Sequence, residues 1–250
     1  MNGYYEHERD NLTGLNILES KNFIYPAHFH HKIELFVLKS GELNVAVNGV
    51  EYNLTSGSIA LFNSYDVHSY NYQSPNLKGF CLIIPPDSAS RFFERNKNKT
   101  AKSPVIFNEN LTSEVYSLIE KYGKNQNNKQ VEIASIELIL SLIESNLEFI
   151  EIDADKDSHL LVKKILTFVN ENFKGDVSLK TVAKSLGYTD AHISRVFNKY
   201  VKKSLTEYVN ELRLGEVEKI ITTKNKPITQ AVFDAGFKSL QTYYRVKGKD

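Results

Sequence analysis

The hydrophobic pattern changes once along the chain, near residue 86. Before that point, apolar and polar residues alternate over short segments, which is the period of a strand with one buried face. Strands are expected at residues 43–47, 50–54, 58–62 and 79–84, with Asn48-Gly49 as a hairpin turn between the first two. Several short strands at this spacing predict a sandwich or a barrel.

Helical spacing follows this region. Short helices are expected over residues 87–96 and 110–122, and a longer helix begins near residue 133. Its apolar residues recur at alternating steps of three and four: Ile133, Ile136, Leu140, Ile143, Leu147 and Ile150. This is an a/d seam of nearly three heptads, and Leu138, Ile139 and Leu142 add a second apolar flank. The seam either packs only against its own domain or also meets a partner helix, and we expect it to form a homodimer contact.

Beyond an Asp-rich stretch, the whole chain is predicted to be helical. Ser178, Thr189 and Ser204 are N-cap signals, the last in a capping box with Glu207. The expected helices cover residues 159–173, 179–186, 190–200, 205–223, 228–235 and from about 239. This pattern divides the chain into an N-terminal domain at 1–152, a linker at 153–158 and a C-terminal helical domain at 159–250.

Charge separates along the same division. Residues 160–250 hold 17 Lys and Arg against 9 Asp and Glu, whereas the preceding residues hold 14 and 21. The net charge of +1 therefore combines about +8 in one part with about −7 in the other. Chance segregation on two solvated surfaces gives the same numbers, but the split is typical of an acidic domain joined to one that binds a polyanion.

Sequence features also exclude some classes of protein. No apolar run reaches the roughly 20 residues of a membrane span, and the first ten residues are polar, unlike a secretory signal. Cys81 is the only cysteine, so a disulfide framework and a cysteine zinc cluster are excluded. We expect a cytoplasmic protein that does not bind membranes.

The segment Leu179–Lys199 has the pattern of a helix-turn-helix. Small Ala183 stands where a second helix must cross closely, Gly187 supplies the turn, and apolar residues of the second helix face the first. The second helix leaves six residues outward: Ala191, His192, Ser194, Arg195, Asn198 and Lys199. Such a face suits the DNA major groove, although a Gly turn between two helices also occurs in plain bundles.

The same unit occurs a second time, at Gly236-Phe237, with the helix over residues 204–223 as a spacer. The stretches SLKTVAKSLGYTDAHISRVFNKY, LTEYVNELRL and ITQAVFDAGFKSLQTYYRV make residues 160–246 resemble the DNA-binding region of the AraC/XylS family of bacterial regulators. The resemblance implies a structural role for Arg213. It also implies that bases are read by Ala191, Ser194 and Arg195 in the first unit and by Gln241, Tyr244 and Arg245 in the second.

The end of the chain departs from this family pattern. In the family, the second recognition helix continues through apolar and basic residues and is followed by one more helix. This chain reads Val246-Lys247-Gly248 and ends two residues later. We expect Gly248 to fray the helix, and the second unit to be truncated, with a weakened or lost groove contact. The first unit is expected to be complete.

The N-terminal domain carries a histidine pattern of its own. His28-x-His30-x-x-x-Glu34 has the spacing of the first cupin motif, and His68 lies where the second motif places its histidine. Residues 28, 30 and 34 share parity, so an extended chain would point all three side chains to one side, into the barrel.

Three interpretations of these residues stay open. Two or three His with one carboxylate suit Mn, Fe, Ni or Zn, but Asn63 and Tyr65 stand where the second motif usually has Pro and Gly. The favoured interpretation is a metal-free effector pocket, and a structural polar network is the third. Tyrosines 25, 70 and 72 have rings suited to stacking on a sugar. The predicted effector-binding residues are His28, His30, Glu34, His68, Tyr25 and Tyr70, with no cofactor.

The sequence thus predicts a multidomain α and β protein. It combines an N-terminal cupin-like β-barrel, a helical dimerisation segment and a C-terminal all-α double helix-turn-helix domain. The expected function is a sequence-specific transcription regulator, not an enzyme, which binds promoter DNA and RNA polymerase and responds to a small effector such as a sugar. Two alternatives are a metal-dependent cupin enzyme with a helical appendage, and a truncated regulator that no longer binds its operator.

Overall fold

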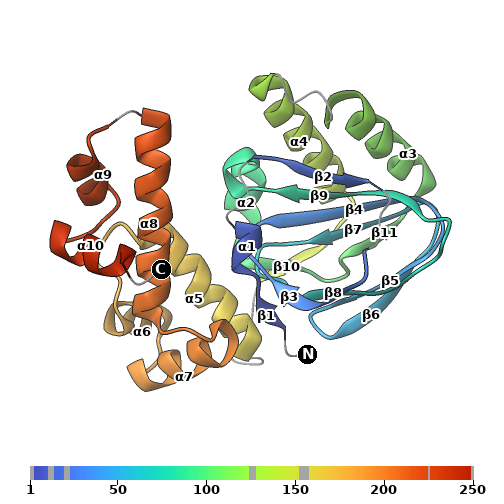
Figure 1. Ribbon diagram of the computed structural model, residues 1–250. Helices are drawn as coiled ribbons and strands as arrows, with labels where there is room; N and C mark the ends of the chain where they lie inside the picture. The colour runs from blue at the N-terminus through green and yellow to red at the C-terminus, as the bar shows by residue number, and fades with distance from the viewer. Residues whose placement is uncertain are drawn as a thin grey trace. The chain divides into compact units, whose positions relative to one another are not determined.

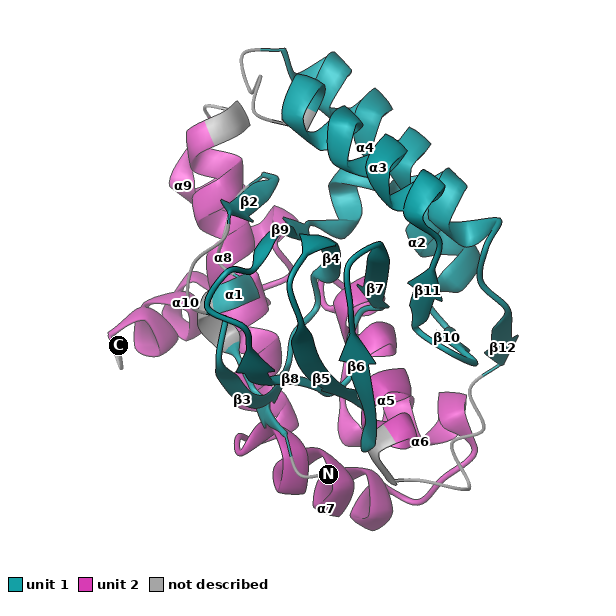
Figure 2. Ribbon diagram, turned by 90° about the vertical axis from the view of Figure 1, so that its right-hand side faces the viewer, with its two compact units in different colours: residues 1–152 teal, residues 153–250 magenta. Residues whose placement is uncertain are grey.

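The computed structural model describes residues 3–10, 14–19, 23–123, 128–151, 158–224 and 226–248. The chain forms two compact units, residues 1–152 and residues 153–250, which are described separately (Figure 2). The predicted linker lies outside the described residues except for its last residue, Ser158, which begins a helix. The predicted fold class is confirmed: a β-rich unit is followed by a helical one.

The first unit is built on two five-stranded sheets. One sheet has the order β1 (Tyr4–Tyr5), β3 (Tyr25–Phe29), β8 (His68–Gln73), β5 (Leu43–Val47) and β6 (Val50–Leu54). The other has the order β11 (Val105–Phe107), β7 (Ser58–Phe62), β4 (Ile33–Ser40), β9 (Lys78–Ile84) and β2 (Asn16–Glu19). The barrel expected from the sequence therefore consists of two facing sheets (Figure 1).

The four strands predicted from alternation are confirmed as β5, β6, β7 and β9. Asn48 and Gly49 join the first two with φ angles of 49° and 90°, as a tight hairpin between right-twisted strands requires. The central strand β4 shows why alternation matters. Its odd-numbered residues from Ile33 to Val37 pack toward helices, whereas Phe36 and Leu38 join the core between the sheets.

Helices cover one face of the second sheet. They are α2 (Ser90–Asn96), α3 (Glu109–Leu118) with a π-helical extension (Ile119–Gly123), and α4 (Lys129–Glu144). Figure 1 shows α3 and α4 side by side over this sheet. Smaller elements complete the unit: α1 (His7–Asp10), a 3-10 turn (Pro86–Ser88), and a two-stranded ribbon of β10 (Lys99–Ala101) and β12 (Phe149–Glu151).

The predicted long helix is shorter than its apolar seam. It ends at Glu144, and Ile150 lies in strand β12, so the prediction of one helix through residue 150 is wrong. Three seam residues, Ile136, Leu140 and Ile143, are buried in the core that α4 shares with the sheet. The second apolar flank of the helix is also only partly accessible: Ile139 is buried, Leu142 is half-buried and Leu138 is exposed. Only the remaining seam positions and the outward side of α4 are accessible to a partner.

The second unit contains the six predicted helices. They are α5 (Ser158–Asn172), α6 (Leu179–Leu186), α7 (Asp190–Val201), α8 (Leu205–Lys224), α9 (Ile228–Asp234) and α10 (Leu240–Lys247). The predicted caps are confirmed: the side chains of Ser178, Thr189 and Ser204 accept hydrogen bonds from backbone N–H groups at helix starts. No described helix of either unit is long and apolar enough to cross a membrane.

The long helix α8 organises this unit. Helices α5, α6 and α7 pack together at one end of α8, and α9 and α10 pack at its other end (Figure 1). The second cluster has its own core, made of Val217 and Ile220 of α8 with Ala231, Val232, Ala235, Phe237 and Tyr243. The pair α6 and α7 and the pair α9 and α10 are therefore two separate helix-turn-helix units joined by α8, as the repeated sequence motif predicts.

Candidate functional site

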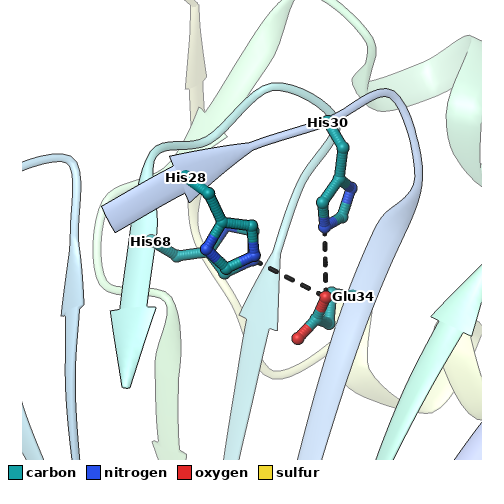
Figure 3. Close-up of side chains that lie close together, drawn as sticks. All are labelled: His28, His30, Glu34 and His68. Atoms are coloured by element: carbon teal, nitrogen blue, oxygen red, sulfur yellow. Dashed lines mark hydrogen bonds and ion pairs between the residues drawn. The ribbon is translucent and has the colours of Figure 1, made fainter. Parts of the chain in front are cut away.

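The four motif residues of the first unit come together in its interior. His28 on β3 is the register partner of His68 on β8, so their side chains lie next to each other on one sheet. Glu34 comes from β4 of the facing sheet, after the chain bends through residues 30–32. One ligand atom from each of His28, His30, Glu34 and His68 lies within 4.8 Å of all the others (Figure 3). The sequence predicted this convergence, but it results from two facing sheets and not from one extended strand.

Backbone carbonyl groups fix the orientation of all three imidazole rings. Nδ1 of His28 lies 2.9 Å from the carbonyl oxygen of Pro26, Nδ1 of His30 lies 3.1 Å from that of Lys32, and Nδ1 of His68 lies 2.8 Å from that of Asp66. A carbonyl oxygen only accepts, so each Nδ1 carries the proton and donates it. Nε2 of each ring then faces the centre (Figure 3).

Glu34 is the carboxylate at this centre. Its Oε2 lies 3.1 Å from Nε2 of His30 and 3.6 Å from Nε2 of His68. Its Oε1 accepts hydrogen bonds from the hydroxyl of Tyr70 and, at 3.2 Å, from the thiol of Cys81. Tyr70, a predicted effector-binding residue, therefore contacts the centre, and so does Cys81, which the sequence analysis did not include.

Burial controls the charge of these groups. Desolvation, with the neighbouring His68, lowers the pKa of His28 to about 2, so this ring is neutral. Desolvation also raises the pKa of Glu34, but the adjacent imidazoles of His30 and His68 outweigh it and hold the pKa well below its usual value. Burial and the adjacent carboxylate raise the pKa of Cys81, so its thiol stays protonated. The centre thus contains the carboxylate of Glu34 together with a neutral His28 ring and a protonated Cys81 thiol.

The N-terminal segment covers the centre. Strand β1 pairs in parallel with β3, and this places Glu6 beside His28, with Oε2 of Glu6 3.5 Å from Nε2 of the ring. Glu6 accepts hydrogen bonds from the hydroxyl of Tyr25 at 2.7 Å and from Nε of Arg9 at 3.0 Å. The ring of Tyr25 also meets the ring of His28 edge-on. Sequence reasoning missed Glu6 and Arg9, because no local spacing connects them with the histidines.

Two further residues show how the degenerate second motif is accommodated. Tyr65, where a glycine is usual, adopts a left-handed φ of 63° and stacks on the ring of His31. Asn63, where a proline is usual, donates from its side-chain amide to the carbonyl oxygens of Asn96 and Lys99. The ring stacking of Tyr65 and the amide hydrogen bonds of Asn63 therefore hold the turn before His68, and His68 keeps its inward position.

The predicted tyrosines differ in their positions. Tyr25 and Tyr70 are contacts of the centre, whereas Tyr72 is exposed on the sheet surface, away from the interior. Phe62 stacks on the ring of His68, with centroids 4.6 Å apart, and fills one side of the centre. The four motif side chains are at most 2 % exposed. The arrangement is a closed set of ligand atoms and not an open cavity.

The first helix-turn-helix unit presents the predicted outer face. Five side chains of α7 are buried against α5, α6 and α8: Ile193, Val196, Phe197, Tyr200 and Val201. On the opposite face, Ala191, Arg195, Asn198 and Lys199 are exposed, and His192 and Ser194 are half-buried. The ring of His192 stacks on that of Tyr188. These six residues share the outward side of α7, and we call them the first reading face.

The second unit has a smaller version of this surface. Gln241, Tyr244 and Arg245 are exposed on α10, and Tyr243 is the one side chain of this helix that is fully buried among the described residues. Gly248 ends the helix, and its N–H still bonds to the carbonyl oxygen of Tyr244. We call these three residues the second reading face.

Arg213 has the structural role that the resemblance implied. Its Nε donates to the carbonyl oxygen of Phe173 and its Nη2 to that of Gly175, both at 2.8 Å. These carbonyls follow the end of α5, where no helical partners remain. Arg213 on α8 therefore fixes the segment after α5.

Comparison with known proteins agrees with both units. Residues 18–143, half of the chain, match the family model for an AraC-like ligand binding domain, and residues 182–247 match a helix-turn-helix domain. The chain is 22 % identical over 218 residues to the uncharacterized transcriptional regulator YbfI of Bacillus subtilis, covering 85 % of this chain and 79 % of that protein. It is 21 % identical to the melibiose operon regulatory protein of Escherichia coli K12, covering 98 % and 86 %.

Among solved structures, ToxT of Vibrio cholerae with a bound unsaturated fatty acid is similar at 16 % identity, with 94 % of this chain and 90 % of that chain covered. Its TM-score of 0.46 is too low to add weight, so the assignment depends on the family models. With a ligand-binding domain followed by a helix-turn-helix DNA-binding domain, the chain belongs to the AraC family of transcription regulators.

Proposed function

We propose that this regulator reads promoter DNA mainly through the first reading face, under the control of a ligand bound at the buried histidine centre. The proposal that the protein reads DNA rests on the geometry of the first reading face. Six outward residues, with Arg195 at their middle, stand on a helix whose inner side is held by five buried side chains. An arginine on such a helix can bind a guanine edge bidentately.

The second reading face is proposed to contact a second major groove. Gln241 can pair with adenine, Arg245 with guanine, and Tyr244 is 55 % exposed for contact with bases or phosphates. Two such helices on one scaffold predict two half-sites about one helical turn, or roughly 10 base pairs, apart.

The sensor part of the proposal uses His28, His30, Glu34 and His68, with Tyr25 and Tyr70 as flanking contacts. The centre is closed, and the segment from Tyr4 to Asp10 covers it. A sugar-sized effector would therefore have to displace this segment, whereas a smaller ligand would not. In either case the signal is a change in population between two arrangements of the protein.

Selection from a random pool of DNA duplexes tests the DNA-reading part. The full-length protein should enrich a sequence with two half-sites, and its affinity should fall steeply as salt increases, because phosphate contacts release counterions. Arg195→Ala should lose the enriched base preference. Arg95→Ala, which removes an exposed arginine of the sensor unit, is the matched control. Affinity that is independent of salt and sequence would contradict the proposal.

Homodimerisation is proposed through the outward side of α4. Leu138 is 49 % exposed at its middle, whereas half of the predicted seam is buried. Leu138→Glu should shift the mass measured by light scattering from dimer to monomer. Phe107→Glu, at an exposed apolar residue of β11, is the control and should leave the mass unchanged. Contact with RNA polymerase and a cytoplasmic location are proposed from the family alone.

A metal-dependent cupin enzyme is the second candidate, because its ligand atoms are present. The centre, however, is flanked by Phe62, Tyr25 and Glu6, and its four motif residues are buried. The family is one of transcription regulators and not of enzymes. The third candidate, a regulator that dimerises without binding its operator, predicts no enriched sequence in the DNA selection.

A further inference from the structure

The turn that leads into His68 is held by hydrogen bonds among its own residues. Nδ1 of His68 donates to the carbonyl oxygen of Asp66, 2.8 Å away. The carboxylate of Asp66 accepts from the backbone N–H of Asn63 at 3.0 Å, and the N–H of Asp66 donates to the carbonyl oxygen of Asn63 at 2.9 Å. The same turn therefore fixes both the ring of His68 and the position of Asn63.

The side-chain amide of Asn63 connects this turn with two other elements. Asn63 is 3 % exposed, and its Nδ2 donates to the carbonyl oxygen of Asn96 at 2.9 Å and to that of Lys99 at 3.1 Å. Its Oδ1 accepts from the N–H of Ser64 at 2.9 Å. Both amide hydrogens are used, and a proline, the usual residue at this place in the second motif, could donate neither.

One branch of this connection leads to the two-stranded ribbon of β10 and β12, which we call the exit ribbon. Lys99 begins β10 and pairs with Glu151, the last residue of β12 (Figure 2). Glu151 is also the last described residue of the first unit before the chain continues into the second unit. The ring of Phe149 on β12 meets that of Phe92 edge-on, with centroids 6.0 Å apart. Loss of the Asn63 amide would therefore loosen the exit ribbon without releasing it.

The other branch leads to the end of α4. Asn96, the last residue of α2, is 2 % exposed, and its Nδ2 donates to Oε1 of Glu144 at 2.8 Å. Glu144 is the last residue of α4. Hydrogen bonds from Arg95 and Asn96 lower the pKa of Glu144, so its carboxylate is charged. A hydrogen bond to a charged acceptor is stronger than one between neutral groups, so this contact holds α2 firmly to α4.

We propose that Asn63 is a positioning residue that transmits the arrangement of the histidine centre to the exit ribbon and to the end of α4. When a ligand moves the ring of His68, the turn and the Asn63 amide move with it. The two carbonyl groups follow, because buried polar groups are costly to leave unpaired. The signal then reaches the strand that precedes the DNA-binding unit and the helix proposed for dimerisation. The inference rests on the proposed sensor role of this centre.

Hydrogen exchange of the full-length protein, measured by mass spectrometry without DNA or ligand, tests this connection. Asn63→Ala should speed exchange in the exit ribbon and at the end of α4 about 10-fold, since each loses about one net hydrogen bond. His68→Ala should speed exchange at the same two places, because the turn loses its bond to the ring. The double variant should exchange no faster than Asn63→Ala alone, because the connection is already cut.

Asn96→Ala separates the two branches. Its backbone carbonyl still accepts from Asn63, whereas its bond to Glu144 is lost, so exchange should become faster at the end of α4 and stay unchanged in the exit ribbon. The turn before His68 is untouched in this variant, so it also tests the inference if Asn63→Ala does not fold. Faster exchange in both places, or in neither, would contradict the branched connection.

Asn71→Ala is the matched control. Asn71 lies on β8, the same strand as His68, but it is exposed and its side-chain oxygen accepts from the hydroxyl of Ser69. Exchange in the exit ribbon and at the end of α4 should therefore equal that of the wild type.

Two further results would overturn the inference. One is unchanged exchange in the exit ribbon and at the end of α4 in folded Asn63→Ala. The other is a double variant in which the effects of His68→Ala and Asn63→Ala multiply, which would mean that the centre acts on these segments independently of Asn63. DNA selection is a separate measurement. Coupled exchange in a protein that selects no DNA sequence contradicts only the DNA-reading role, and sequence selection without coupled exchange contradicts only this inference.

Discussion

The two helix-turn-helix units have nearly the same local sequence pattern, but they are held very differently. Both have a serine or threonine N-cap before the recognition helix and a glycine with a left-handed φ in or before the turn, 79° at Gly187 and 94° at Gly236. The recognition helix has 12 residues in the first unit and 8 in the second. It buries five side chains in the first unit, whereas Tyr243 alone is fully buried in the second.

The turns differ in the opposite sense, because the turn of the second unit is the more tightly packed of the two. A Cβ atom added at Gly187 would meet nothing within 4 Å, whereas one added at Gly236 would lie 2.5–2.8 Å from backbone atoms of Lys174. The aromatic residue after each glycine follows the same rule: Tyr188 is half-buried and Phe237 is buried. The first unit is therefore fixed through its recognition helix, and the second through its turn, which docks on the segment after α5.

This difference shows that two copies of one sequence motif can be held in the fold by different parts of the motif. A firmly packed recognition helix can hold its side chains in position against DNA, whereas a firmly packed turn mainly locates the unit on the segment after α5. Four predictions test this division, in order of decreasing effect.

Gly236→Ala should have the largest effect on stability. The left-handed φ costs about 1–2 kcal/mol for alanine, and the close approach of the Lys174 backbone adds overpacking, so the total is about 3 kcal/mol. Gly187→Ala should cost only about 1 kcal/mol, since its surroundings are open. Hydrogen exchange measured by mass spectrometry should localise the loss of protection to residues 226–248. Equal losses of stability in Gly236→Ala and Gly187→Ala would contradict the conclusion that the second turn is packed more tightly than the first.

Arg213→Ala should come next, at about 2 kcal/mol. The change removes two charge-assisted hydrogen bonds to carbonyl groups on either side of Lys174, against which Gly236 packs. Chemical denaturation followed by circular dichroism measures the loss. Arg213→Lys keeps the charge but loses the planar fork, so it should recover less than half of the stability. Full recovery by lysine would show that charge alone matters.

Arg195→Ala should weaken specific DNA binding about 10-fold or more, and Arg245→Ala about 3-fold or less. The reason is that α7 holds Arg195 on a packed helix, whereas α10 is short and mostly exposed. Gel-shift titration of the selected duplex measures both. A larger loss for Arg245→Ala would reverse the assignment of the main reader. Melting temperatures should be unchanged, because both side chains are exposed.

Lys238→Ala should have the smallest effect. Its Nζ lies 3.6 Å from Oδ1 of Asp176, across the junction of the second turn with the segment after α5, but both side chains are largely exposed. Exposed ion pairs of this kind contribute little, so no measurable change in melting temperature is expected. A clear loss of stability, sensitive to salt, would mean that charge and not backbone packing docks the second turn.

The sequence predicted local structure well wherever one residue determines it. Asn48-Gly49, the capping residues Ser178, Thr189 and Ser204, and the two turn glycines all have the predicted roles. Arg213, placed by family resemblance, has the expected structural contacts. These features depend on φ angles and hydrogen bonds within a few residues.

The prediction was poorer where distant segments meet. The seam on α4 has the period of a dimer contact, but Ile136, Leu140 and Ile143 are occupied by the domain's own core, because periodicity gives a face and not what covers it. Glu6 and Cys81 reach the histidine centre from β1 and β9, and no spacing in the sequence connects them to it.

The histidine centre shows this division most clearly. By itself, the sequence determined that His28, His30, Glu34 and His68 would converge, since motif spacing and strand alternation select the inward side. Only the tertiary structure decided what they can bind. Facing sheets and the N-terminal segment close the centre, and three carbonyl groups turn each Nε2 inward. Whether a buried polar cluster is a pocket, a network or an ion site depends on the space and the donors around it, and those come from residues far apart in the chain.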